Sequence, residues 1–141
     1  MNDFELLNEK LLSLRGSVAH VVGFGLDDIS GKLLRDGIFF DKPKVITLDW
    51  CSAGLCHNNS IYVWAENMDN LRICTGYAID KDVWYRHTWC VDTNNVIYEC
   101  TPYARGAYYG KILDLEESKE FIAQVLYPNE IEKINDKIAR R

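Results

Sequence analysis

The segment from residue 83 to residue 101 constrains the fold of this chain more than any other. Its two halves, VWYRHTWCV and VIYECT, carry the β-branched and aromatic residues that are typical of strands. Asp92-Thr93-Asn94-Asn95 lies between them, and these residue types favour turns. The segment is a predicted β-hairpin, and its register decides which side chains share a face of the sheet.

The register of this hairpin determines whether Glu99 can reach His87. A three-residue loop, Thr93–Asn95, pairs Val91 with Ile97 and places Glu99 on the His87 face, one diagonal step away. A loop of two or four residues sends Glu99 to the opposite face. We predict the three-residue loop because it joins two apolar side chains and gives a carboxylate on the buried side a partner.

The rest of the chain shows helical periods near both ends and after residue 56. Asn2 is a predicted helix cap, and Gly16 ends the first helix. Further helices are predicted over residues 57–67, 114–126 and 129–141, and further strands over 44–48 and 71–79. Residues 17–43 and 102–112 follow no clear period and are expected to form loops that build a cleft. The prediction is one α+β domain, residues 1–141, with a helix, a strand meander and then helices.

Composition excludes several functions. A chain of 141 residues with 48% hydrophobic and 26% charged residues is long enough to bury a core without metal or disulfides. Its net charge of −5 argues against binding nucleic acid, which requires a basic face. The N-terminal MNDFELLNEK lacks the apolar stretch of a signal peptide, and no apolar run is long enough to span a membrane. We therefore expect a cytoplasmic protein that binds neither membranes nor nucleic acid.

Cys56 differs from the other four cysteines in its position. A cytosolic chain keeps its thiols reduced, so no disulfide is expected, and Cys51, Cys74, Cys90 and Cys100 are interpreted as core residues. Cys56 lies in GLCHNNSIYVW, where a loop becomes a helix. The free N–H groups and dipole at a helix N-terminus stabilise a thiolate, and the same N–H groups can donate to an oxyanion. Cys56 is therefore the candidate nucleophile.

His87 and Glu99 are the candidate partners of this thiol. His87 lies in the middle of a strand and shares a face with Trp89 and Val91, which is a rigid and apolar setting for a general base. In the predicted register, Glu99 accepts the other ring N–H of His87 and sets its tautomer. A thiol, an imidazole and a carboxylate in this arrangement carry out nucleophilic acyl transfer.

The order of these residues resembles that of transglutaminase-like, papain-fold cysteine enzymes. The matching elements are Cys56, Gly76-Tyr77, His87-Thr88-Trp89 and Glu99-Cys100-Thr101-Pro102, within roughly residues 50–105. The resemblance implies a papain-like core in which the helix of the cysteine packs on an antiparallel sheet. It also implies a cysteine hydrolase or acyltransferase with a Cys-His-acid triad, which needs no cofactor or metal and acts on a peptide, amide or acyl substrate.

The third element departs from the family pattern. That pattern usually has Asp-Pro-Thr where this chain has Glu-Cys-Thr, so Asp92 stays open as an alternative acid. His57 is not expected to act as the base, because neighbouring helical side chains point about 100° apart. It lines the cleft or lies in solvent. Weaker candidates for an oxyanion donor or a substrate contact are Trp50, through its indole N–H, Asn58 and Trp89.

Two other functions compete with an enzyme. Cys51, Cys56 and His57, together with Cys74, Cys90 or Cys100, form a possible zinc site. The absence of a Cys-x2-Cys pair disfavours it. A non-catalytic adaptor that uses the same fold to bind a partner is the other alternative, because function depends on a site and not on a fold.

Overall fold

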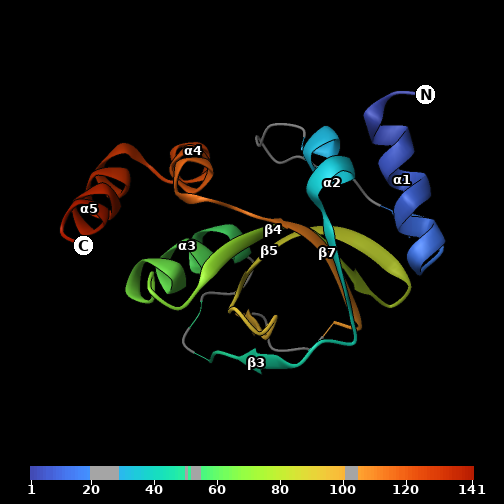
Figure 1. Ribbon diagram of the computed structural model, residues 1–141, viewed down its shortest axis with the longest axis horizontal. Coiled ribbons are helices and arrows are strands. Elements are labelled where there is room, and N and C mark those ends of the chain that lie inside the picture. The colour runs from blue at the N-terminus through green and yellow to red at the C-terminus, as the bar shows by residue number, and fades with distance from the viewer. Residues whose placement is uncertain (20–28, 50, 52–54, 101–104) are drawn as a thin grey trace.

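A curled β-sheet carries the helices of this protein. The computed structural model describes residues 1–19, 29–49, 51, 55–100 and 105–141. Within these ranges the helices are α1 (Asp3–Leu14), α2 (Ser30–Asp36), α3 (Cys56–Glu66), α4 (Leu115–Val125) and α5 (Pro128–Ala139). The strands are β1 (Val18–Ala19), β2 (Ile38–Asp41), β3 (Val45–Thr47), β4 (Arg72–Asp80), β5 (Val83–Val91), β6 (Ile97–Glu99) and β7 (Ala107–Ile112). The expected α+β class, with helices at both chain ends, is confirmed (Figure 1).

The sheet is not the simple antiparallel meander that we expected. Its strand order is β2-β7-β4-β5-β6-β3, so the late strand β7 lies between β2 and β4. β3 pairs with β6 in parallel, and β1 pairs in parallel with β5. β7 also replaces part of the loop predicted over residues 102–112. Its first four residues are buried, and a strand covered on both faces shows no alternation of apolar and polar residues.

The hairpin forms in the predicted register. Val91 pairs with Ile97, and the turn between β5 and β6 is held by the side chain of Asp92. Its carboxylate accepts hydrogen bonds from the backbone N–H groups of Asn94 and Val96, at 2.8 and 3.0 Å. This turn chemistry keeps the loop at three residues and thereby sets the face on which β6 presents its side chains.

The helix boundaries follow the capping residues of the sequence. The Asn2 side chain accepts a hydrogen bond from the Glu5 N–H at 2.8 Å and begins α1. Beyond the last turn of α1, Gly16 has φ +85°, a conformation that favours glycine. Asp114 begins α4 with a capping box, and Pro128 opens α5. No helix in the described parts of the chain has the length and apolar character needed to cross a membrane.

The helices lie along the outer side of the curled sheet, and β3 lies on the opposite side (Figure 1). Three buried clusters hold these layers together. The first joins α3, α4 and α5 to the sheet through residues that include Ile61, Trp64, Ile73, Phe121, Ile122 and Ile134. The second lies beneath α1 and α2 and includes Leu7, Leu11, Leu33, Tyr77 and Trp84. The third lies around Phe40, Trp89, Val91, Ile97 and Tyr108.

Gly76 has no room for a side chain at the centre of this sheet. It pairs with Gly110 of β7 on one side and with His87 of β5 on the other. A Cβ atom at Gly76 would lie 2.1 Å from the carbonyl oxygen of Tyr109 and 2.6 Å from the Cα of Gly110. Both neighbours are backbone atoms of a paired strand, so neither can move without opening the β4–β7 ladder.

We predict that Gly76→Ala lowers the free energy of unfolding by about 1–3 kcal/mol, because the extra methyl group forces these strands apart. Urea unfolding followed by circular dichroism measures the change. Gly31→Ala is the matched control: in α2 its nearest neighbour is the movable carboxylate of Asp3, so it is expected to be neutral or stabilising. Equal stabilities of the two variants would contradict the close approach of β4 and β7.

Candidate active site

Cys56 is the first residue of α3 and is half-buried. Leu55 precedes it at the N-cap position, and the apolar Leu55 side chain makes no capping hydrogen bond to the first turn of α3. Two contacts fix α3 against β5: the Ser60 hydroxyl donates to the Thr88 carbonyl at 3.1 Å, and the Cys90 thiol donates to the Ser60 carbonyl at 3.3 Å. The thiol of Cys56 is thereby held at the border between helix and sheet.

His87 and Glu99 form a buried pair across the hairpin. The Nε2 atom of His87 lies 2.8 Å from Oε1 and 2.9 Å from Oε2 of Glu99. The two residues are 3% and 0% exposed, so water does not screen their interaction. The predicted placement of Glu99 on the His87 face is confirmed, and Asp92, the alternative acid, is engaged in the turn instead.

The carboxylate of Glu99 has further hydrogen-bond donors around it. The Tyr108 hydroxyl donates to it at 2.9 Å, the Arg105 guanidinium at 3.4 Å and the Cys100 backbone N–H at 3.2 Å. Burial by itself raises the pKa of this carboxyl, but the His87 hydrogen bond and charge, with Arg105 and Tyr108, lower the pKa below its ordinary value. Glu99 is therefore a fixed anion inside the protein.

The two histidines next to Cys56 determine the state of its thiol. Burial opposes ionisation, but side-chain hydrogen bonds with His57 and His87, and the charge of the His87 ring, lower the pKa of Cys56 to about 5. Because Nε2 of His87 is bound to Glu99, Nδ1 is the nitrogen left for the thiol. Burial favours the neutral His87 ring, but Cys56 and Glu99 together raise its pKa. The arrangement favours a thiolate–imidazolium pair at neutral pH.

The position of His57 corrects an expectation. The argument from helical geometry placed its ring away from Cys56, yet the ring lies close enough to lower the pKa of the Cys56 thiol. The 100° rotation between neighbours sets the Cα–Cβ directions, but a ring as long as imidazole reaches back across the end of the helix. Its Nδ1 atom lies 2.5 Å from the Thr88 hydroxyl, and its ring packs edge-on against Phe121 with 5.8 Å between centroids.

Cys51 and Cys100 are joined by a disulfide, which corrects the prediction that both are reduced core residues. Their Cα atoms are 5.4 Å apart. The bond ties the segment that precedes α3 to the residue that follows Glu99. Cys74 and Cys90 are free and buried in the core, as expected. In the described part of the chain, no group of three or more His, Cys, Asp or Glu side chains is arranged to hold a metal ion.

The three weaker candidates for an oxyanion donor or a substrate contact are Trp50, Asn58 and Trp89. Trp50 is outside the described residues, and Asn58 is half-buried in the first turn of α3. Trp89 is 0% exposed and stacks on His87 with 5.8 Å between ring centroids, so its indole lies inside the protein behind that histidine. Its indole N–H is buried without a hydrogen-bond partner among the described residues.

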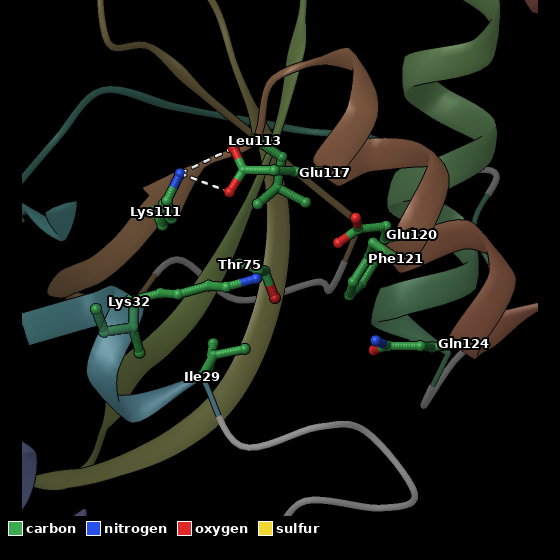
Figure 2. Close-up of a pocket in the computed structure, with 10 residues that line it drawn as sticks. Ile29, Lys32, Thr75, Lys111, Leu113, Glu117, Glu120, Phe121 and Gln124 are labelled. Carbon is green, nitrogen blue, oxygen red and sulfur yellow. Dashed lines mark hydrogen bonds and ion pairs between the residues drawn. The ribbon is translucent and has the colours of Figure 1, made fainter. Parts of the chain in front are cut away.

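A pocket of about 90 Å³ lies between α2, β4, β7 and α4. Figure 2 shows the Lys111–Glu117 ion pair on one side of it and Lys32 on another. Thr75 and Phe121 also line this pocket, and Phe121 contacts the ring of His57. The pocket therefore borders the side chains that surround His57, on the face of the sheet that α3 covers.

Sequence reasoning missed several residues of this site. Thr88 contacts His57, and Thr75 and Arg86 follow behind Thr88. Arg105 and Tyr108 contact Glu99. The pairing of Thr75 with Thr88 was accessible in principle, because β4 and β5 form a tight hairpin of alternating residues. Tyr108 had no comparable signal, because β7 itself was not predicted.

Comparison with known proteins identifies no relative: no protein-family model, no curated protein and no solved structure matches this chain. The geometry of the site is therefore the basis for its interpretation.

The site leads to a prediction about thiol reactivity. Iodoacetamide is expected to modify Cys56 alone in the folded protein, because burial raises the pKa of both Cys74 and Cys90. The alkylation rate should rise through a midpoint near pH 5, where the Cys56 thiol ionises. Mass spectrometry of the modified peptide over a pH series measures both. In His87→Ala the midpoint should move upward; an unchanged midpoint would contradict the pairing of this thiol with His87.

The disulfide leads to a prediction about stability. It closes a loop with a sequence separation of 49, so reduction should lower the free energy of unfolding by about 4 kcal/mol. Thermal unfolding with and without dithiothreitol measures this difference. The stability of the double variant Cys51→Ser/Cys100→Ser should not change when dithiothreitol is added. If dithiothreitol destabilises this variant as much as the native protein, the loss of stability does not come from the disulfide.

Proposed function

We propose that this protein is a cysteine-dependent acyl-transfer enzyme of the papain-like, transglutaminase-like class. The observation that carries the proposal is the buried His87–Glu99 pair beside a half-buried thiol at a helix N-terminus, whose pKa the His87 ring lowers. A structural histidine needs no reactive thiol beside it, and a core cysteine needs no ionised partner. Their combination supplies a nucleophile, an acid–base group and an orienting carboxylate.

In the first half of the reaction, the Cys56 thiolate attacks the carbonyl carbon of the substrate. The carbonyl π electrons move onto oxygen, and the first N–H groups of α3 stabilise this oxyanion. The tetrahedral intermediate collapses as the bond to the leaving group breaks, and the His87 imidazolium gives its proton to that group. The product of this half-reaction is a thioester on Cys56 and a neutral imidazole.

In the second half, an acceptor attacks the thioester. Water gives hydrolysis, and an amine gives transfer. His87 takes the proton of the acceptor, and the thiolate leaves, which restores the thiolate–imidazolium pair. Glu99 holds the ring in one tautomer throughout, while Tyr108 and Arg105 keep the carboxylate ionised and in place.

The substrate that fits this chemistry is a peptide, another amide or an activated acyl compound. The net charge of −5 gives no favourable field to an anionic polymer. The site requires no cofactor in this mechanism.

Electrophilic acyl probes test the proposal directly. A panel of amide, ester and thioester probes is expected to leave an acyl group on Cys56, identified by mass spectrometry of the intact protein and its peptides. Turnover should fall roughly 10²–10⁴-fold in His87→Ala and Glu99→Gln, because each removes a part of the acid–base pair.

Asp92→Asn is the matched control for the carboxylate. Asp92 holds the turn of the same hairpin, so its variant should keep turnover within a few-fold of the native protein once it is shown to be folded. Failure of every probe to acylate Cys56 in folded protein would contradict the enzyme proposal. A partner-binding activity that survives Cys56→Ser would then favour the adaptor.

A further inference from the structure

A chain of hydrogen bonds runs from Arg86 to His57 between β4, β5 and α3. The Arg86 guanidinium donates to the Thr75 hydroxyl at 2.6 Å. The hydroxyl oxygens of Thr75 and Thr88 are 2.7 Å apart, and the Thr88 hydroxyl lies 2.5 Å from Nδ1 of His57. Thr75 and Thr88 are 3% and 1% exposed, so both hydroxyls depend on protein partners.

The direction of these bonds follows from the donor at one end. A guanidinium only donates, so the Thr75 oxygen accepts from Arg86 and its own proton is available for Thr88. Thr88 then accepts from Thr75 and turns its proton toward His57. In this direction each hydroxyl donates once and accepts once within the chain. The reverse direction leaves the Thr75 proton without an acceptor in the chain.

This direction determines the tautomer of His57. An Nδ1 atom that accepts a hydrogen bond carries no proton, so the proton of the ring lies on Nε2. The ring has a hydroxyl partner, whereas His87 has the carboxylate of Glu99. The two histidines beside Cys56 therefore differ in kind: the partner of His87 is a carboxylate, whereas the partner of His57 is a hydroxyl that donates to Nδ1 and leaves the ring proton on Nε2.

We propose that His57 is a positioning residue of the thiol site: a neutral imidazole, held as its Nε2–H tautomer by Thr88, Thr75 and Arg86, that acts as a hydrogen-bond donor to Cys56. The role concerns the thiolate itself and shares the site of the proposed function, without depending on turnover. Such a donor stabilises the Cys56 thiolate without taking up the thiol proton, so His87 can accept that proton and transfer it.

The ionisable groups around Cys56 come from two elements, α3 and β5. From α3 the neighbour is His57, and from β5 the neighbours are His87 and Arg86, whose charge interacts with the thiol. Glu99 is bound to Nε2 of His87, so the ring of His87 lies between this carboxylate and Cys56. Arg86 also donates to the backbone carbonyls of Gly76 and His87, at 3.1 and 3.2 Å, so the donor end of the chain is fixed to the sheet.

The pH dependence of Cys56 alkylation by iodoacetamide tests the proposal. His57→Phe keeps a ring against Phe121 but removes the donor, and the midpoint is expected to rise by about one pH unit. His57→Gln, whose amide can donate, should recover part of this shift. A midpoint in His57→Phe equal to that of the native protein would overturn the proposal.

The chain behind His57 is tested by a matched pair of variants. Thr88→Val removes the hydroxyl at nearly constant volume and should raise the midpoint by about half a pH unit, whereas Thr88→Ser keeps the hydroxyl and should leave it unchanged. Equal midpoints in these two variants would show that the hydrogen bonds from Arg86 to His57 do not act on Cys56, and would overturn the proposal. Circular dichroism and thermal unfolding establish that each variant is folded.

A measurement on the native protein avoids the risk that a variant misfolds. The ¹⁵N chemical shifts of labelled histidine distinguish the two neutral tautomers and the cation. At neutral pH, His57 is expected as the neutral Nε2–H form and His87 as the imidazolium. A His57 cation or Nδ1–H tautomer would overturn the proposal.

These outcomes are separable from those of the proposed function. If no probe acylates Cys56 but His57→Phe still moves the alkylation midpoint, the enzyme proposal fails and the role of His57 stands. If His87→Ala moves the midpoint and abolishes acylation while His57→Phe does neither, the role of His57 fails and the enzyme proposal stands.

Discussion

The bond between His87 and Glu99 is the interaction on which the site and much of the sheet depend. A carboxylate that is 0% exposed is stable only when charged and hydrogen-bonding partners replace the water it has lost. Those partners come from β5, from β7 and from the segment that leads into β7. One anion therefore links the hairpin of β5 and β6 to a strand that arrives later in the chain, and misplacing either strand leaves a buried charge unpaired.

The sequence predicted the parts of this arrangement that depend on local rules. The turn at Asp92 sets the register of the hairpin, and the register alone brings Glu99 to the face of His87. The helix beginning at Cys56 was likewise a local prediction. Tyr108 and Arg105 were not accessible in this way, because β7 is buried on both faces and shows no period. Their contribution to the carboxylate appears only when distant segments are brought together.

Three side chains lie elsewhere than the sequence predicted, because each prediction used only the neighbours of the residue in the chain. Cys51 and Cys100 are separated by 49 positions, and only the folded sheet shows that they meet. His57 was set aside because of the angle between adjacent helical side chains, but its position is decided by Thr88 across the interface with β5. In both cases a tertiary contact overrides what the local pattern indicates.

The edge of β5 explains how one thiol meets two imidazoles that belong to opposite faces of the sheet. On the side away from β4, this strand pairs with β1 at residues 83 and 84 and with β6 at residues 90 and 91. Between these pairings, the described residues supply no neighbouring strand. His87 lies at the centre of that gap, and Thr88, which holds His57, points to the other face. A side chain at the end of α3 can reach both faces only where the edge of the sheet is open. The gap in strand pairing along this edge of β5 is therefore the structural condition for the site.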